Sequence, residues 1–450
     1  MIPHACLRVI LPLSLLCRFA DSPSPPLLRS CFPAAASIVA SPRQPRRVAR
    51  NVDLFCLKLL KLHTSTTIFV DLTPLLPGGA NGGAKPFVLA LLTQLAQRHP
   101  EALFVAICQP ACLSELKPLA RANFVFRCVD GADAPQRLLG SRRLARLRQR
   151  FWRRSSGAIP ASAKLLFAPF GAPLLHRSGL PMVSTFYDLQ VEAYPAFFPD
   201  AVRSERRYHF DQMAAKATSI AAISEFSREV AIGHGVAADR IVAIPIQLAQ
   251  HRHGSAVADP PFQLEAGRYL LYPANFWRHK NHELLFTAFA MARQQGLDPG
   301  IQLVCTGDGV DRLDLLCHLR DGLGLSSSLL LPGFVSNCEL EALLQHCLAL
   351  VFPSLYEGFG MPVIEAMARG IPVACSSSTS LGEVAGDAAI LFDPRNPQQI
   401  STAMLTIASL SPGQRQELVE KGLRQSQRYQ DSARMADQYW ELFHAAMNPC

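Results

Sequence analysis

From residue 66 onward, apolar runs alternate with amphipathic stretches in a regular order. The pattern predicts a buried strand at 66–72, a glycine-rich loop at 75–85, an amphipathic helix at 86–100 and a second strand at 103–109. Further strands that run into polar loops are predicted at 182–188 and 219–224. Strand and helix in alternation are typical of a doubly wound parallel sheet.

A second alternating run follows a stretch at 247–267 that contains Gly, Pro, His and Ala without any hydrophobic period. We interpret this stretch as an interdomain linker. The elements predicted after it are strands at 268–274, 301–307, 329–334, 348–353 and 371–376, and helices at 282–296, 311–324, 336–347 and 361–370. The predicted fold class is therefore α/β, with two Rossmann-like doubly wound domains that face a central cleft. Ligands of such folds bind beyond the carboxyl ends of the strands.

The ends of the chain differ from its middle. The first 64 residues hold Pro and Ser clusters without sustained periodicity, and we interpret them as a disordered leader or a misassigned start. A last helix carries Tyr439, Trp440 and Phe443, which we expect to be core contacts, and it is predicted to pack across the domain junction. The predicted segments are a leader at 1–64, an N-terminal Rossmann-like domain at 65–248, a C-terminal Rossmann-like domain at 249–430 and a helix at 431–450.

Charge is distributed unevenly along the 450 residues. The formal net charge is +9, and seven arginines lie between Arg142 and Arg154, interleaved with leucines and aromatic residues. This segment predicts a peripheral contact with anionic lipid or with an anionic acceptor, and a solvated surface helix or loop remains the alternative. No nucleic-acid-binding motif accompanies the arginines, so no nucleic-acid partner is expected. No apolar run reaches the roughly 18 residues of a membrane span.

The thirteen cysteines contain no CxxC pair and sit singly in apolar stretches. An odd number without zinc-type spacing argues for a reducing compartment. We therefore expect a cytoplasmic protein, with the basic segment allowing peripheral attachment at the inner face of the plasma membrane. No DxD motif and no cluster of His, Cys and carboxylates is found, so the sequence predicts no metal.

The segment PSLYEGFGMPVIEAMARG, residues 353–370, carries the strongest chemical pattern. The predicted strand ends at Pro353, a loop follows, and a helix opens near Met361 with Pro362 in its first turn and Gly370 just past its end. Free amides and the dipole at a helix start favour an anion. The glycines at 358 and 360 would let the backbone approach a diphosphate.

Two glutamates of this segment are eight residues apart, Glu357 in the loop and Glu365 in the helix. A carboxylate suits the paired hydroxyls of a ribose because it accepts two hydrogen bonds. The alternative is a surface charge at Glu357 and an ordinary helix-face residue at Glu365. The strand–loop–helix context favours the functional interpretation.

These residues resemble a known family. EGFGMPVIE is similar to the E-x7-E motif of glycosyltransferase family 4, whose fold is GT-B, and the flanking FPSLYEGFG, GEVAGDAAILFDP and LLLPGFVSNCELEALLQHC match it as well. YPANFWRHKNHELLFTAF resembles the donor-phosphate segment of the family, PGGANGG its first glycine loop and AAISEFSRE a strand–helix junction. The resemblance covers about residues 66 to 445.

The resemblance implies roles for individual residues. It assigns Glu365 to the nucleotide ribose, Glu357 to the transferred sugar and Lys280 to the donor phosphate, where an ammonium offsets charge on the leaving diphosphate. The remaining donor-binding residues that it implies are Gly82, Gly83, Gly358, Phe359, Gly360 and Met361. The alternatives are a surface lysine at 280 and an ordinary flexible turn at 82–83.

Two positions depart from the family pattern. Asn275 stands where many relatives have an arginine, and Arg278 nearby is a substitute for that charge. Tyr187, followed by Asp188, stands where relatives have a histidine before an aspartate. A tyrosine donates a hydrogen bond but does not titrate near neutral pH as histidine does, so Tyr187 is either a sugar contact or an aromatic wall residue.

The activity that the resemblance implies is a retaining, metal-independent hexosyl transfer. The donor would be a nucleotide sugar, GDP-mannose or a UDP-sugar, acting as substrate without a further cofactor. The acceptor would be a glycan or a lipid-linked molecule in polysaccharide or O-antigen biosynthesis. Two alternatives stay open: a non-catalytic nucleotide-sugar-binding subunit, which the residues at 187 and 275 suggest, and a nucleotide-sugar epimerase on the same plan.

Overall fold

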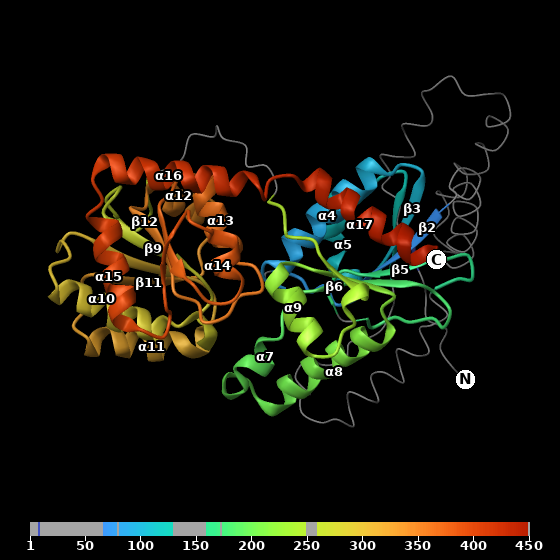
Figure 1. Ribbon diagram of the computed structural model, residues 1–450, viewed down its shortest axis with the longest axis horizontal. Coiled ribbons are helices and arrows are strands. Elements are labelled where there is room, and N and C mark those ends of the chain that lie inside the picture. The colour runs from blue at the N-terminus through green and yellow to red at the C-terminus, as the bar shows by residue number, and fades with distance from the viewer. Residues whose placement is uncertain are drawn as a thin grey trace, which may run out of the picture. The chain divides into compact units, whose positions relative to one another are not determined.

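The computed structural model describes residues 8–9, 66–78, 81–128, 159–171, 173–248 and 259–448 (Figure 1). The chain divides into two compact units. The first unit comprises Met1–Thr185, Ser204–Ile220 and Ala436–Cys450, and the second comprises Phe186–Arg203 and Ala221–Met435. The basic segment from 142 to 154 and the leader, apart from residues 8–9, lie outside the described residues.

The strands form two sheets. The first sheet has the order β1-β4-β3-β2-β5-β6-β7-β8, with parallel pairing from β4 through β6 and β1 antiparallel to β4. Its strands are β1 (Arg8–Val9), β2 (Thr66–Leu72), β3 (Ala102–Cys108), β4 (Phe124–Cys128), β5 (Leu165–Ala168), β6 (Met182–Phe186), β7 (Ser219–Ala222) and β8 (Ile241–Ala243). The strands predicted from 66, 103, 182 and 219 are thus all present, with ends that differ by one or two residues.

The second sheet is parallel throughout, in the order β11-β10-β9-β12-β13-β14. Its strands are β9 (Tyr269–Pro273), β10 (Gln302–Thr306), β11 (Leu329–Gly333), β12 (Ala349–Phe352), β13 (Val373–Ser376) and β14 (Ile390–Phe392). The chain builds outward from β9 in one direction and then returns to place β12 on its other side. The carboxyl ends of β9 and β12 therefore flank the topological switch point, where open α/β sheets bind ligands.

Helices cover both sheets (Figure 1). In the second unit α10, α11 and α15 lie on one side of the sheet, and α12, α13 and α16 lie on the other (Figure 1). The α-helices are α4 (Ala84–Arg98), α5 (Leu113–Leu116), α7 (Gln190–Ala193), α8 (Asp200–Lys216), α9 (Glu225–Gly233), α10 (His282–Gln294), α11 (Val310–Gly322), α12 (Asn337–His346), α13 (Met361–Ala368), α14 (Ser380–Ala385), α15 (Pro397–Ala408), α16 (Pro412–Gln427) and α17 (Ser432–Met447). Within the described residues, no helix combines the length and apolarity that crossing a membrane requires.

The last helix contributes to the core of the first unit. The Tyr439 and Phe443 side chains are fully buried, and the Phe443 ring lies 5.0 Å from that of Phe167 on β5. The Trp440 ring stacks on His99 at 4.0 Å, and the Tyr439 hydroxyl lies 3.1 Å from the Thr185 hydroxyl. Tyr439 and Phe443 are thus core contacts, as expected, whereas Trp440 is only partly buried. Residues of α17 up to Met435 belong to the second unit, and those from Ala436 belong to the first.

Candidate functional site

An ion pair lies at the switch point of the second sheet. Lys280 ends the short 3₁₀ helix that follows β9, and Glu357 lies in the loop that follows β12. The Lys280 Nζ atom lies 2.5 Å from Glu357 Oε1, and each side chain is only 14% exposed. The Ser354 hydroxyl donates to the same carboxylate oxygen at 2.5 Å. The fold thus joins two predicted site residues that are 77 positions apart.

The backbone next to this ion pair is held by hydroxyl groups of three residues. The Tyr272 hydroxyl donates to the Lys280 carbonyl at 2.7 Å, and burial keeps the pKa of that phenol well above its usual value. The Glu357 N–H donates to the Thr379 hydroxyl at 3.1 Å. The Ser380 hydroxyl donates to the carbonyls of Glu357 and Phe359 at 2.9 and 3.0 Å. Both charged side chains therefore project from constrained backbone, as a site that positions a ligand requires.

The helix start predicted near Met361 is present. Gly360 precedes α13 with a left-handed φ of +102°, and no side chain caps the helix. Pro362 occupies the first turn and Gly370 follows the helix end with φ +70°, as predicted. A Cβ atom at Gly360 would lie 2.4 Å from the Leu381 Cδ2 atom, so both the backbone conformation and the packing require glycine there.

Gly358 has a structural role that the sequence did not indicate. A Cβ atom at this position would lie 2.5 Å from the Tyr187 carbonyl oxygen. The Gly358 carbonyl accepts hydrogen bonds from the hydroxyls of Ser224 and Ser227 at 2.7 and 3.1 Å. Glycine is therefore required at position 358 because the backbone there lies close to the loop of the protein that contains Tyr187. The Phe359 side chain is buried, with its ring 5.4 Å from that of Tyr429. Only the backbone of this residue is therefore available to contact a sugar donor.

Glu365 lies on α13 in a partly buried environment. Burial raises the pKa of its carboxyl above the ordinary value of 4.5, the nearby Arg369 charge lowers it and the Glu341 charge raises it. The Arg369 guanidinium makes two hydrogen bonds to the Glu341 carboxylate, at 2.6 and 3.1 Å, and a third to the Glu365 carbonyl at 2.8 Å. The Arg369 charge therefore interacts with the Glu341 carboxylate as well as with Glu365.

The residues that depart from the family pattern have local structural contacts. The Asn275 side-chain oxygen accepts the Asp308 N–H at 2.9 Å, which joins the loops after β9 and β10. Arg278 is exposed in the first position of the 3₁₀ helix. The Tyr187 carbonyl accepts the Ser227 hydroxyl at 2.8 Å. The Asp188 carboxylate accepts the backbone N–H of Gln190 at 3.2 Å.

The glycine loop belongs to the first unit. Gly82 adopts a left-handed φ of +52°, and Gly83 immediately precedes α4. The Lys85 ammonium donates to the carbonyl of Gly78 at 2.7 Å, and the Glu115 carboxylate accepts the Gly78 N–H at 2.9 Å. Lys85 and Glu115 also form an ion pair with one another. Charged side chains therefore hold the loop that the sequence predicted to contact a donor.

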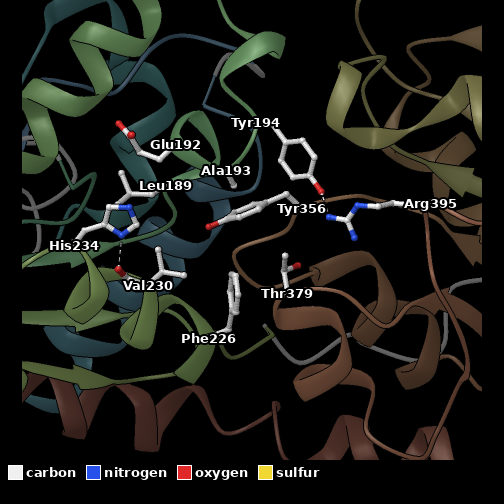
Figure 2. A pocket seen from close by; sticks show the side chains of 10 residues that line it. All are labelled: Leu189, Glu192, Ala193, Tyr194, Phe226, Val230, His234, Tyr356, Thr379 and Arg395. Carbon is white, nitrogen blue, oxygen red and sulfur yellow. Dashed lines mark hydrogen bonds between the residues drawn. The ribbon is translucent and has the colours of Figure 1, made fainter.

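A pocket of about 420 Å³ adjoins the ion pair within the second unit (Figure 2). Its wall includes Tyr194, Phe226, Tyr356, Thr379 and Arg395. Figure 2 shows the Tyr194 hydroxyl directed toward the Arg395 guanidinium, and these groups are 2.5 Å apart. The volume lies within the range of small-ligand sites.

Sequence reasoning missed most of the residues around this pocket. Thr379 follows β13 and Arg395 follows β14, so their positions at carboxyl ends of strands were the available signal. Among the described residues, no group of three or more His, Cys, Asp and Glu side chains is placed to hold a metal ion. That the reaction needs no metal stays a prediction.

Comparison with known proteins gives a family match for the second unit. Residues 260–425 match the model of the family "Glycosyl transferases group 1". The O-antigen chain mannosyltransferase B of Escherichia coli is 32% identical over 231 residues, which cover 50% of this chain and 60% of that protein. The serotype-specific mannosyltransferase WbdA of Escherichia coli is 29% identical over 44% of this chain and 26% of its own length. The chain thus spans less than two thirds of these relatives.

Solved structures share the fold. HepE from Anabaena, in complex with UDP and glucose, superposes with a TM-score of 0.63 at 17% identity, covering 84% of this chain and all of that chain. Sucrose-phosphate synthase from Thermosynechococcus elongatus gives a TM-score of 0.65 at 19% identity, covering 84% of this chain and 98% of that chain. These similarities confirm the predicted α/β fold class of the GT-B type.

Proposed function

We propose that this protein, which has the GT-B fold, is a retaining hexosyltransferase, because residues 260–425 match the model of the family "Glycosyl transferases group 1". The donor in this proposal is GDP-mannose, and the acceptor is a glycan or a lipid-linked saccharide. The observation that carries the proposal is the Lys280–Glu357 pair at the switch point, beside the start of α13. The mannosyltransferase names of the relatives support mannose, whereas the UDP bound to HepE keeps a UDP-sugar as the second candidate donor.

The proposed chemistry uses a few groups of the second unit. A leaving diphosphate would compete with Glu357 for the Lys280 ammonium, which offsets the charge that develops as the glycosidic bond breaks. The uncapped start of α13 adds favourable dipole charge for the same anion. Glu365 binds the nucleotide ribose. In front-face transfer, the acceptor hydroxyl forms its bond to the anomeric carbon on the same face from which the nucleoside diphosphate departs, so the product keeps the anomeric configuration. The departing phosphate oxygen takes the hydroxyl proton.

Donor titration tests the ribose assignment. We expect the Glu365→Ala variant to bind GDP-mannose at least about tenfold more weakly, because two hydrogen bonds to one carboxylate are lost. Isothermal titration calorimetry with GDP-mannose, GDP and UDP-glucose measures this, and circular dichroism verifies that the variant is folded. Equal affinity of the wild-type and variant proteins for every nucleotide would refute the assignment of Glu365 to the nucleotide ribose.

Product analysis separates the proposed transferase from its alternatives. Transfer from GDP-mannose to p-nitrophenyl α-D-mannopyranoside should release free GDP and give a product that proton NMR identifies as the α-anomer. A binding subunit would release no GDP. An epimerase would convert GDP-mannose into another nucleotide sugar without an acceptor.

The proposed location is the cytoplasm, with the segment from 142 to 154 attached to the membrane surface. This segment is strongly basic, which favours contact with anionic lipid. Co-sedimentation with phosphatidylglycerol vesicles tests the proposal, with the seven arginines changed to glutamine as the comparison. Equal binding of both proteins would assign the contact to another surface.

A further inference from the structure

The pocket beside the ion pair shares a backbone contact with the proposed transfer site. Thr379 lines the pocket, and its hydroxyl accepts the N–H of Glu357 at 3.1 Å. Tyr356 lines it as well and precedes Glu357 in the chain. A molecule bound in the pocket would therefore lie next to the residue assigned to the transferred sugar.

Aromatic rings form a fixed wall of the pocket. The Tyr356 ring makes edge contacts with Tyr194, at 6.3 Å and 83°, and with Phe226, at 5.6 Å and 68°. The Tyr194 ring also stacks on Phe197 at 5.1 Å. Rings held in this way offer flat apolar surface with little loss of side-chain entropy on binding. Such a wall fits the C–H face of a pyranose ring.

The polar groups of the pocket include an acid and bases. Glu192 supplies a carboxylate and Arg395 a guanidinium, and hydroxyl groups come from Thr379 and Tyr194 (Figure 2). The His234 imidazole lines the pocket as well, and these groups together can both accept and donate hydrogen bonds. A ring that carries several hydroxyl groups and no net charge satisfies both kinds of partner.

The start of α9 argues against an anion in this pocket. Phe226 lies in the first turn of α9, whose free amides would ordinarily attract a phosphate. The Glu383 carboxylate accepts the N–H groups of Glu225 and Phe226, at 3.0 and 2.9 Å. The helix start is thus already neutralised by a carboxylate of the protein, and a second anion would be repelled.

We propose that this pocket binds a neutral pyranose residue of a saccharide acceptor. The inference rests on the proposed function, because it names the acceptor class for the same site. The aromatic wall packs against the sugar ring. The Glu192 carboxylate accepts hydrogen bonds from the sugar hydroxyls, and the Arg395 guanidinium donates hydrogen bonds to them. The pocket thereby holds the acceptor beside Glu357.

Kinetics of charge-neutral variants test the proposal in the full chain. In transfer from GDP-mannose to p-nitrophenyl α-D-mannopyranoside, Glu192→Gln and Arg395→Gln should each raise the acceptor KM about tenfold and leave the donor KM within about twofold. Arg424→Gln on α16 is the matched control, since the Arg424 side chain is 65% exposed and that of Arg395 is 60% exposed. An unchanged acceptor KM, or a raised donor KM, would overturn the assignment.

A binding measurement without donor separates this inference from the proposed function. Saturation-transfer NMR with methyl α-D-mannopyranoside and methyl α-D-glucopyranoside should show binding of at least one glycoside to the wild type, lost in Arg395→Gln and in Phe226→Ala. This result would support the pocket even if the wild type released no GDP from GDP-mannose, which would refute only the transferase proposal. Three results would refute the saccharide pocket. The wild type could show no glycoside signal, both variants could keep the signal, or GDP could displace the glycoside.

Discussion

Removing one charge of the Lys280–Glu357 pair should destabilise the second unit. With an effective dielectric constant of ~20, unit charges 2.5 Å apart attract by about 7 kcal/mol. Desolvation of the two ions offsets most of this attraction. Removal of one partner leaves the other charge in a site where each side chain is 14% exposed, and for buried pairs this costs about 3–5 kcal/mol. Because the pair keeps some exposure, we expect the lower end, about 3 kcal/mol, for Lys280→Met.

Double-mutant analysis measures the coupling directly. Lys280→Met and Glu357→Gln should each cost about 3 kcal/mol, and the double variant should cost clearly less than their sum, with a coupling of about 1–3 kcal/mol. Scanning calorimetry should show each single variant melting about 6–12 °C lower, since a unit of this size shifts by about 2–4 °C per kcal/mol.

The Arg268–Asp298 pair in the same unit is the control. It is bidentate, at 2.8 and 3.0 Å, but its side chains are 36% and 50% exposed. Arg268→Met should therefore destabilise the protein much less than Lys280→Met, because solvent screens an exposed pair. If Lys280→Met costs no more than this control, or if the double variant is additive, the ion pair is not the constrained element inferred from its burial.

The other predictions concern Glu365 and Gly358. Burial raises the pKa of the Glu365 carboxyl, so the folded protein loses stability as pH rises from 4.5 through the raised value. The Glu365→Gln variant lacks this loss, and urea unfolding from pH 4 to 8 should show its advantage over the wild type growing with pH to a plateau; parallel curves would contradict the raised pKa. Gly358→Ala should cost about 1–3 kcal/mol or more, because its Cβ would lie 2.5 Å from the Tyr187 carbonyl, and a melting temperature equal to that of the wild type would disprove this close contact.

Much of the fold follows from local sequence pattern. Fully apolar runs bounded by turn residues predicted the buried strands, because strands covered on both faces carry little polar alternation. Pro362 and Gly370 marked the ends of α13 correctly, since each residue has a backbone preference that acts locally. Boundaries were less accurate: the strand predicted at 182–188 ends at Phe186, where the polar loop begins.

Residue type and motif order predicted the chemistry of the second unit, because helix starts attract anions and because ligands of open α/β sheets bind beyond the carboxyl ends of the strands. The tertiary structure alone decided which groups meet. Lys280 and Glu357 are paired only because β9 and β12 are neighbours in the sheet, and Gly358 is required to be glycine only because the 187 loop crosses it. Likewise, Glu341 on α12 acts on Glu365 only because it pairs with Arg369 at the end of α13. Electrostatic and steric energies depend on distance in space, and a single sequence records only distance along the chain.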